Sequence, residues 1–416
     1  MIVLQRQRID WLDFTRFLCA FMILGIHWLR ACFKTGLFGV GEKNVLVDGY
    51  QGQTIGLGML PHVLIAGSAP TLPVWLSNLV GLLGGFGWEA VSALIIVSGF
   101  SLSLSLGTKS LDLAQWLDWL AKRAKRILVP FYLIALPFLA AYFLLLLVVP
   151  KFHGSFAHGI DKKLHELFHT PLLGVLMSHI ALFDPFQRQG IASFFAPAWW
   201  FVPAILVAYA SYPFLIWIAR RNEMALFFGS AALSIATYAL VERNILIDES
   251  WYYIVLQESF NFSLGILAGK AWLTTSRREA IERVLRPWYA FPVGLAMFAL
   301  GNVANWSSST RPIASIFFGP GLLLMLVAIS MYAQKSALAH VARKIDSYDI
   351  YLVHQPFAFP IALAGRFLFN EYAIFVGMFA FYAIAILAAM LLGNVRRRLE
   401  RRTVHPTRGA VPIIRA

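Results

Sequence analysis

Residues 10–33 read DWLDFTRFLCAFMILGIHWLRACF, an apolar segment long enough to cross a membrane as one helix. It contains two ionisable residues that a simple membrane anchor does not need, Arg16 and His27. The eleven positions that separate them bring both side chains to the same helix face, about 16 Å apart. Asp13, three residues before Arg16, shares that face. Because charge within a bilayer is costly, such residues are usually retained for function.

Two interpretations of this polar stripe are open. In the structural one, Asp13 and Arg16 form an ion pair and His27 bonds to a backbone carbonyl of a neighbouring helix. In the functional one, His27 takes a proton from a hydroxyl group, since histidine titrates near neutral pH. Arg16 is then a fixed cation suited to a phosphate or a carboxylate. Ionisable residues within membrane spans usually have a functional role, which favours the functional interpretation.

The composition predicts an all-α polytopic membrane bundle. Of the 416 residues 59% are hydrophobic and only 13% are charged, about half of the charged fraction of a soluble domain. Ten apolar segments are long enough to span a hydrocarbon core of about 30 Å. They are roughly 10–33, 79–106, 127–149, 199–218, 224–241, 251–273, 288–304, 313–332, 347–369 and 372–394.

The distribution of Lys and Arg predicts the orientation. With a cytoplasmic N-terminus, 23 of the 35 basic residues lie on the inside, as the positive-inside rule expects. Both termini are then cytoplasmic. We expect an integral-membrane domain over 1–395 and a basic cytoplasmic tail over 396–416. The net charge of +14 reflects topology and contact with the anionic lipid bilayer, so no nucleic-acid partner is expected.

The second span carries two further polar residues of interest. Glu89 stands in an otherwise uncharged stretch, where it either orients a histidine or forms a structural pair with a cation. Ser98 precedes Gly99, a combination that marks close helix packing more often than nucleophilic catalysis. The flanking glycine and the strand-turn-helix setting of a nucleophile elbow are both missing from this stretch.

Two later stretches also carry ionisable groups. Arg123 and Arg126 lie in the basic loop 109–126, where they either set the orientation or grip a polyanion with two guanidinium groups on one face. His354 lies about two turns inside the ninth span. It is either a helix-to-helix hydrogen-bonding residue or part of a site.

The external loop contains a match to a metalloprotease pattern, His165-Glu166-Leu167-Phe168-His169. Its context does not suit a zinc site. Pro171 follows almost at once, and the residue before a proline disfavours helix, so the helix that must present both histidines is short. We therefore expect no bound metal, and favour a loop that titrates with protons or faces a substrate.

Several of these features occur together in one order that resembles membrane-bound acyltransferase family 3, whose members O-acylate bacterial polysaccharides and other cell-envelope molecules. Each feature is short, but the five in order within ten spans form a fairly specific pattern. They are Leu12-Asp13 with Arg16 and His27; Val97-Ser98-Gly99-Phe100; Arg123, Arg126 and Pro130; Trp199-Trp200-Phe201 with Tyr212-Pro213; and Ser347-Tyr348 with Ile350-Tyr351-Leu352, His354 and Pro356.

The resemblance implies an acyl-CoA-dependent O-acyltransferase of the bacterial inner membrane. His27 is the implied catalytic residue, and Arg16, Arg123 and Arg126 match positions associated with activity and with the CoA phosphates. We expect Glu89 to orient His27 as general base; a covalent acyl-histidine relay is the variant. Asp13, Ser98, Tyr351 and His354 are expected to support the site.

The implied donor is acyl-CoA, most simply acetyl-CoA, used as co-substrate with no bound cofactor. The implied acceptor is a glycan or a lipid-linked sugar, and polysaccharide-synthesis machinery is a possible partner. Two other classes compete. A transporter or flippase for a lipid-linked envelope precursor also suits buried charge, but the internal repeat typical of transporters is not found. A glycosyltransferase of the O-antigen-polymerase kind needs larger external loops with acidic or arginine-rich sites.

Overall fold

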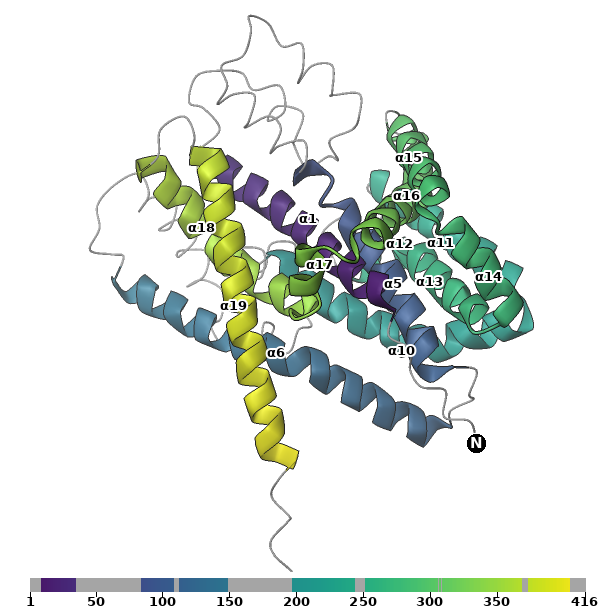
Figure 1. Cartoon of the computed structure of the whole chain (residues 1–416), viewed down its shortest axis with the longest axis horizontal. Helices are drawn as coiled ribbons and strands as arrows, with labels where there is room; N and C mark the ends of the chain where they lie inside the picture. The colour runs from purple at the N-terminus through teal and green to yellow at the C-terminus, as the bar shows by residue number, and fades with distance from the viewer. Residues whose placement is uncertain are drawn as a thin grey trace, which may run out of the picture.

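The structure is a computed structural model that describes residues 9–34, 84–107, 112–148, 197–243, 251–305, 307, 309–368 and 373–404. Every regular element within these ranges is a helix, which confirms the all-α fold (Figure 1). The elements are α1 (Asp10–Lys34), α5 (Glu89–Leu106), α6 (Leu113–Val148), the 3-10 helix η3 (Pro197–Trp200), α10 (Phe201–Arg221), α11 (Glu223–Glu242), α12 (Trp251–Gln257), α13 (Ser259–Trp272), α14 (Thr275–Val284), α15 (Pro287–Ala304), α16 (Arg311–Ala333), α17 (Ala337–Ala342), α18 (Ser347–Leu368) and α19 (Ala373–Val404).

The helices support the prediction of a multi-pass membrane protein. They do not determine the number of membrane spans. Each of the ten predicted segments contains helix in its described part. Among the described residues, six helices are long and apolar enough to cross a membrane, and the pair α14 and α15, bent by 71°, would make a seventh. The total of ten and the position of the termini stay predictions. The six are α1, α5, α10, α11, α16 and α19.

Helix α1 lies at the centre of the bundle. Of its most apolar window 72% is buried, against 22% for the peripheral helix α11, and it packs on α5, α16, α18 and α19. Two side-chain bonds fix its position. Thr15 donates to Ser330 of α16 at 2.9 Å, and the Trp28 indole donates to the Ile374 carbonyl of α19 at 3.1 Å. The polar stripe of α1 is therefore held inside protein.

One predicted boundary was wrong. The segment 109–126 is not an open loop in its described part, because α6 runs without interruption from Leu113 to Val148. Residues 113–129 contain neither glycine nor proline, so nothing ends the helix before the membrane segment begins. In the second predicted span, 79–106, residues 84–85 are helical, a turn follows at 86–88 in a glycine-rich stretch, and α5 begins at Glu89; residues 79–83 lie outside the described ranges.

Close packing of α5 on α13 depends on glycine. A Cβ atom on Gly99 would collide with the Phe262 carbonyl oxygen, and one on Gly265 would collide with the Ile96 carbonyl oxygen. Small residues allow two helix backbones to approach in this way. The interpretation of Ser98-Gly99 as a packing element is confirmed for the glycine.

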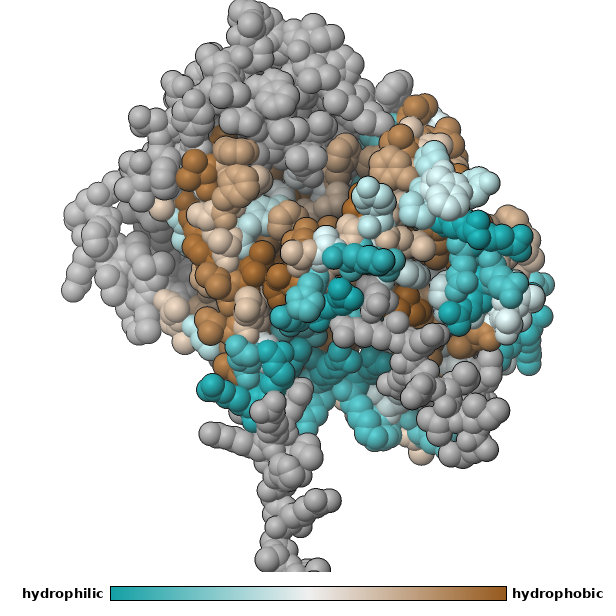
Figure 2. Space-filling view, viewed as in Figure 1, coloured by the Kyte–Doolittle hydropathy of each residue, from teal (hydrophilic) through white to brown (hydrophobic). Residues whose placement is uncertain are grey.

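The surface separates apolar and polar residues along the molecule. Apolar side chains cover the upper part of α19 and the helices beside it, and polar side chains gather toward its lower end (Figure 2). Helix α6 crosses this lower part in Figure 1. Helix α19 continues past residue 395, where we expected the tail to begin, to Val404. Its first arginine, Arg396, is consequently part of the bundle.

Candidate active site

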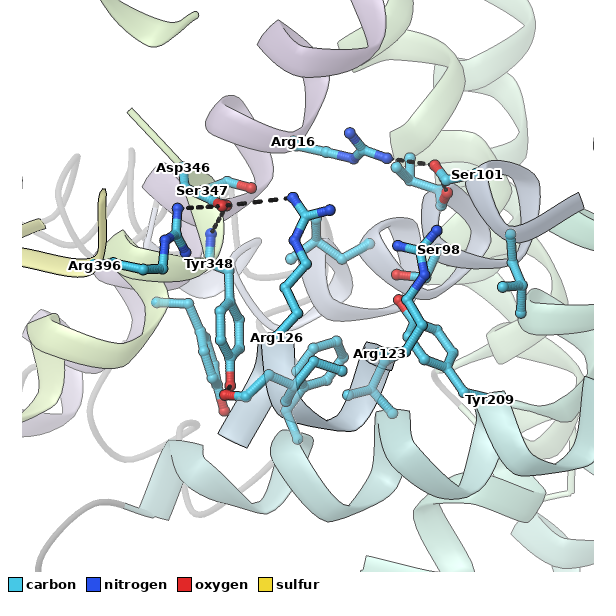
Figure 3. A pocket seen from close by; sticks show the side chains of 17 residues that line it. Arg16, Ser98, Ser101, Arg123, Arg126, Tyr209, Asp346, Ser347, Tyr348 and Arg396 are labelled. Atoms are coloured by element: carbon cyan, nitrogen blue, oxygen red, sulfur yellow. Dashed lines mark hydrogen bonds and ion pairs between the residues drawn. The ribbon is translucent and has the colours of Figure 1, made fainter. Parts of the chain in front are cut away.

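A pocket with a volume of about 220 Å³ opens between α1, α5, α6, α10, α18 and α19. Four arginines from three helices, α1, α6 and α19, line this pocket (Figure 3). Asp346 is the one carboxylate among its lining residues. The lining charge is therefore strongly positive. The arginines are Arg16, Arg123, Arg126 and Arg396.

Arg16 is held on two sides. Its Nη1 lies 3.2 Å from Oδ1 of Asp13, three residues earlier on α1, and its Nη2 donates a hydrogen bond to Ser101 on α5. Ser101 in turn donates to the Val97 carbonyl at 2.6 Å. The ion pair of Asp13 with Arg16, which the structural interpretation of the stripe predicted, is present, and it leaves the guanidinium at the wall of the pocket, with the Arg16 side chain 31% exposed.

Arg126 and Arg396 approach the same carboxylate from opposite sides. Asp346 Oδ2 lies 3.1 Å from Nη2 of Arg396 and 4.0 Å from Nη2 of Arg126. Arg396 also reaches Asp349, with 3.0 Å between Nη1 and Oδ1. Together these two carboxylates hold the side chains of both arginines in place.

Aromatic side chains complete the wall near Arg123. The Arg123 guanidinium lies 5.3 Å from the ring centroid of Trp119, in a cation–π arrangement. Tyr209 of α10 lines the pocket and packs on Trp119, with ring centroids 6.2 Å apart. Ser98 also lines the pocket, as Figure 3 shows. The pocket thus combines cationic groups with flat aromatic faces.

Tyr351 connects the pocket to the buried histidines. It lines the pocket, and its ring centroid lies 5.8 Å from that of His354, one turn further along α18. The His354 ring lies 4.9 Å from the ring of His27 on α1. Both histidines are buried. Ring-to-ring contacts therefore lead from Tyr351 at the pocket through His354 to His27, although α1 and α18 lie near opposite ends of the sequence.

Glu89 has a second carboxyl group close to it. Glu89 is buried at the start of α5, near the carboxyl group of Glu258, the residue that directly precedes α13. Glu258 accepts hydrogen bonds from Ser92 and Asn261, each at 2.7 Å. The ring that the structure places against His27 is that of His354. The orienting role of Glu89 stays a prediction.

Of the predicted residues, the structure brings Arg16, Ser98, Arg123, Arg126 and Tyr351 to one pocket. The sequence analysis missed four of its polar groups. Ser101 lies one turn beyond Val97-Ser98 and Asp346 directly precedes the motif that starts at Ser347, so proximity to a motif is the signal that would have found them. Arg396 was hidden in a run of arginines that we assigned to the basic cytoplasmic tail. The four missed residues are Ser101, Tyr209, Asp346 and Arg396.

No metal centre emerges within the described ranges, where no three His, Cys, Asp or Glu side chains converge on one point. The pattern His165-Glu166-x-x-His169 lies outside the described residues.

The fold and the pocket define a class: a multi-pass helical membrane protein with a cationic pocket beside two buried histidines. Comparison with family models identifies the family. The chain belongs to acyltransferase family 3, because the family's model, described as an acyltransferase domain, matches residues 9–394. This confirms the resemblance found in the sequence motifs. Neither a curated protein nor a solved structure gives a significant match to the chain.

Proposed function

We propose that this membrane acyltransferase moves an acyl group, most simply acetyl, from cytoplasmic acyl-CoA to a hydroxyl group of an extracytoplasmic or lipid-linked glycan. The proposed location is the bacterial inner membrane, with acyl-CoA as co-substrate and no bound cofactor. Polysaccharide-synthesis machinery is the proposed source of the acceptor. The single observation that carries the proposal is the four-arginine pocket connected to His27 through Tyr351 and His354.

The pocket suits the donor for electrostatic reasons. Acyl-CoA carries several phosphate oxygens on a nucleotide, and guanidinium groups bind such oxygens in pairs through charge-assisted hydrogen bonds. Arg123 and Arg126 reach the pocket from one helix, while Arg16 and Arg396 reach it from two others. The positive-inside prediction puts Arg123 and Arg126 on the cytoplasmic side, where acyl-CoA is made.

The proposed chemistry uses His27 as general base. Its imidazole takes the proton of the acceptor hydroxyl while the hydroxyl oxygen attacks the thioester carbonyl. The carbon–sulfur bond breaks, and the thiolate of CoA takes the proton back from His27. Burial of His27 keeps water, which would hydrolyse the thioester, away from the reacting atoms. In the variant, His27 attacks the thioester itself and carries the acyl group to the hydroxyl.

The experiment is transfer of label in a defined system. Purified protein in phospholipid vesicles is incubated with [14C]acetyl-CoA and a deproteinised cell-envelope glycan fraction. An acyltransferase converts label into a mild-base-labile ester on the glycan, with one CoA thiol released for each ester. A transporter or flippase moves glycan across the vesicle membrane without fixing label, and that result would replace the proposed function.

A further inference from the structure

His354 is enclosed entirely by other parts of the protein. Its side chain is 0% exposed, and it lies on α18 between the rings of Tyr351 and Phe381 and the ring of His27. The Phe381 centroid lies 6.5 Å away, in an edge-to-face arrangement. A polar side chain in such surroundings needs hydrogen-bonding partners for its ring nitrogens, because an unsatisfied buried group is costly.

One ring nitrogen has its partner, and that partner fixes the tautomer. His354 Nδ1 lies 2.6 Å from the backbone carbonyl oxygen of Tyr351, three residues earlier on the helix. A carbonyl oxygen can only accept, so Nδ1 carries the hydrogen and donates it. In a neutral imidazole the other nitrogen, Nε2, is then a hydrogen-bond acceptor with a free lone pair.

The second ring nitrogen is buried and accepts no hydrogen bond from the described part of the chain. It belongs to a ring whose centroid is 4.9 Å from that of His27, a separation at which one nitrogen of each ring can approach to hydrogen-bonding distance. The acceptor therefore stands beside the residue that the proposed function makes the general base.

We propose that His354 is a positioning residue that receives a hydrogen bond from His27 during the reaction. The inference rests on the proposed function. When His27 takes the proton of the acceptor hydroxyl, it becomes an imidazolium with two N–H groups and one positive charge. One N–H keeps the transferred proton for the departing thiolate. The other donates to Nε2 of His354, which stabilises the charge and fixes the ring. In catalytic triads a carboxylate does this work; here a neutral histidine of fixed tautomer does it.

Two substitutions separate this role from simple packing. In His354→Asn, the side-chain amide takes the place of the Nδ1–H group and can still donate to the Tyr351 carbonyl, but no atom stands at the position of Nε2. In His354→Gln, the longer side chain can present its carbonyl oxygen as an acceptor near that position. His354→Asn therefore keeps the hydrogen bond to the Tyr351 carbonyl but loses the acceptor for His27. His354→Gln supplies a substitute acceptor for His27.

We expect His354→Asn to lower kcat for label transfer by about 10- to 100-fold, the value of a hydrogen bond to a charged group. The KM for acetyl-CoA and the unfolding midpoint in detergent should stay at the values of the unsubstituted protein. His354→Gln should recover at least part of kcat relative to His354→Asn. Recovery of kcat without a change in KM is a pattern that a packing role does not produce.

The inference is overturned if His354→Asn retains the kcat of the unsubstituted protein, or if both variants lose kcat equally with unchanged unfolding midpoints. Those results leave the proposed function intact, because the unsubstituted protein still transfers label. If the unsubstituted protein transfers no label in the same assay, the proposed function fails, and the role of His354 fails with it. The two failures are distinguished within one experiment.

Discussion

Arg396 Nη1 lies 3.0 Å from Oδ1 of Asp349, an ion pair that ties the C-terminal helix α19 to the first turn of α18. Asp349 is 1% exposed and the Arg396 side chain 15%, so the pair is largely shielded from water. Helix α18 also carries Tyr351 and His354, which link the pocket to His27. The position of this helix, and with it the geometry of the candidate site, therefore depends on a residue outside every motif of the family resemblance.

Loss of this arginine should destabilise the fold. Arg396→Ala leaves the carboxylate of Asp349 buried without its cation, which costs about 3 to 5 kcal/mol of unfolding free energy for a buried pair. Arg398→Ala is the matched control. Arg398 is an exposed arginine of the same helix, so its loss should change stability by less than about 0.5 kcal/mol. Thermal unfolding of both variants in the same detergent decides the matter; equal midpoints would show that the ion pair does not hold the helices together.

The arginines of α6 should act on donor affinity. Arg123→Ala and Arg126→Ala each remove charge-assisted bonds to phosphate oxygens, so we expect a 10- to 100-fold rise in KM for acetyl-CoA, from about 1.5 to 3 kcal/mol per group. Lys122→Ala removes the same charge from the same helix, but Lys122 is 75% exposed and pairs with Asp118 away from the pocket. Its KM should stay unchanged. A similar rise in all three variants would indicate a general electrostatic effect in place of a binding site.

Glycine packing between α5 and α13 gives a stability prediction that is independent of function. Gly99→Ala places a methyl group against the Phe262 carbonyl, and overpacking of this kind costs about 1 to 3 kcal/mol. Gly229→Ala on α11 is the control, since no atom lies within 4 Å of its added Cβ. It should be neutral or stabilise by up to about 1 kcal/mol, because alanine favours helix. Unfolding midpoints in the opposite order would contradict the close contact.

The predicted topology can be tested without an activity assay. Ten spans with a cytoplasmic N-terminus return the C-terminus to the cytoplasm. A fluorescent protein that folds only in the cytoplasm should therefore fluoresce when it is fused after residue 404, and a periplasmic phosphatase fused there should be inactive. The reverse pattern would mean an odd number of spans or an inverted chain, and would separate the arginine pocket from a cytoplasmic donor.

The sequence was sufficient for the helical class, the family and most of the arginine pocket. Apolar length predicts membrane helices directly. Arg16, Arg123 and Arg126 stand out because charge near or within apolar segments is rare. The pairing of Asp13 with Arg16 follows from helical spacing alone. Each of these features can be recognised from residues that are close together in the sequence.

The contacts between distant segments were not predictable in the same way. Nothing in the spacing of His27 and His354 indicates that their rings meet, because the crossing of α1 and α18 is set by packing across the whole bundle. Glu89 looked like the natural partner of His27, being a lone acid on the next span. The structure shows that it lies near Glu258, a residue that the sequence analysis did not single out. Arg396 was hidden for the opposite reason, since it stands among several arginines of similar appearance.

The most direct test of the central claim is acyl transfer by His27→Ala. The variant is compared with the unsubstituted protein in vesicles that contain [14C]acetyl-CoA and the glycan fraction, with unfolding midpoints measured on the same preparations. We predict that His27→Ala unfolds within a few degrees of the unsubstituted protein and binds acetyl-CoA equally well, but forms no labelled ester above background. Ester formation at the unsubstituted rate by the folded variant would contradict the assignment of His27 as the residue that carries the reaction.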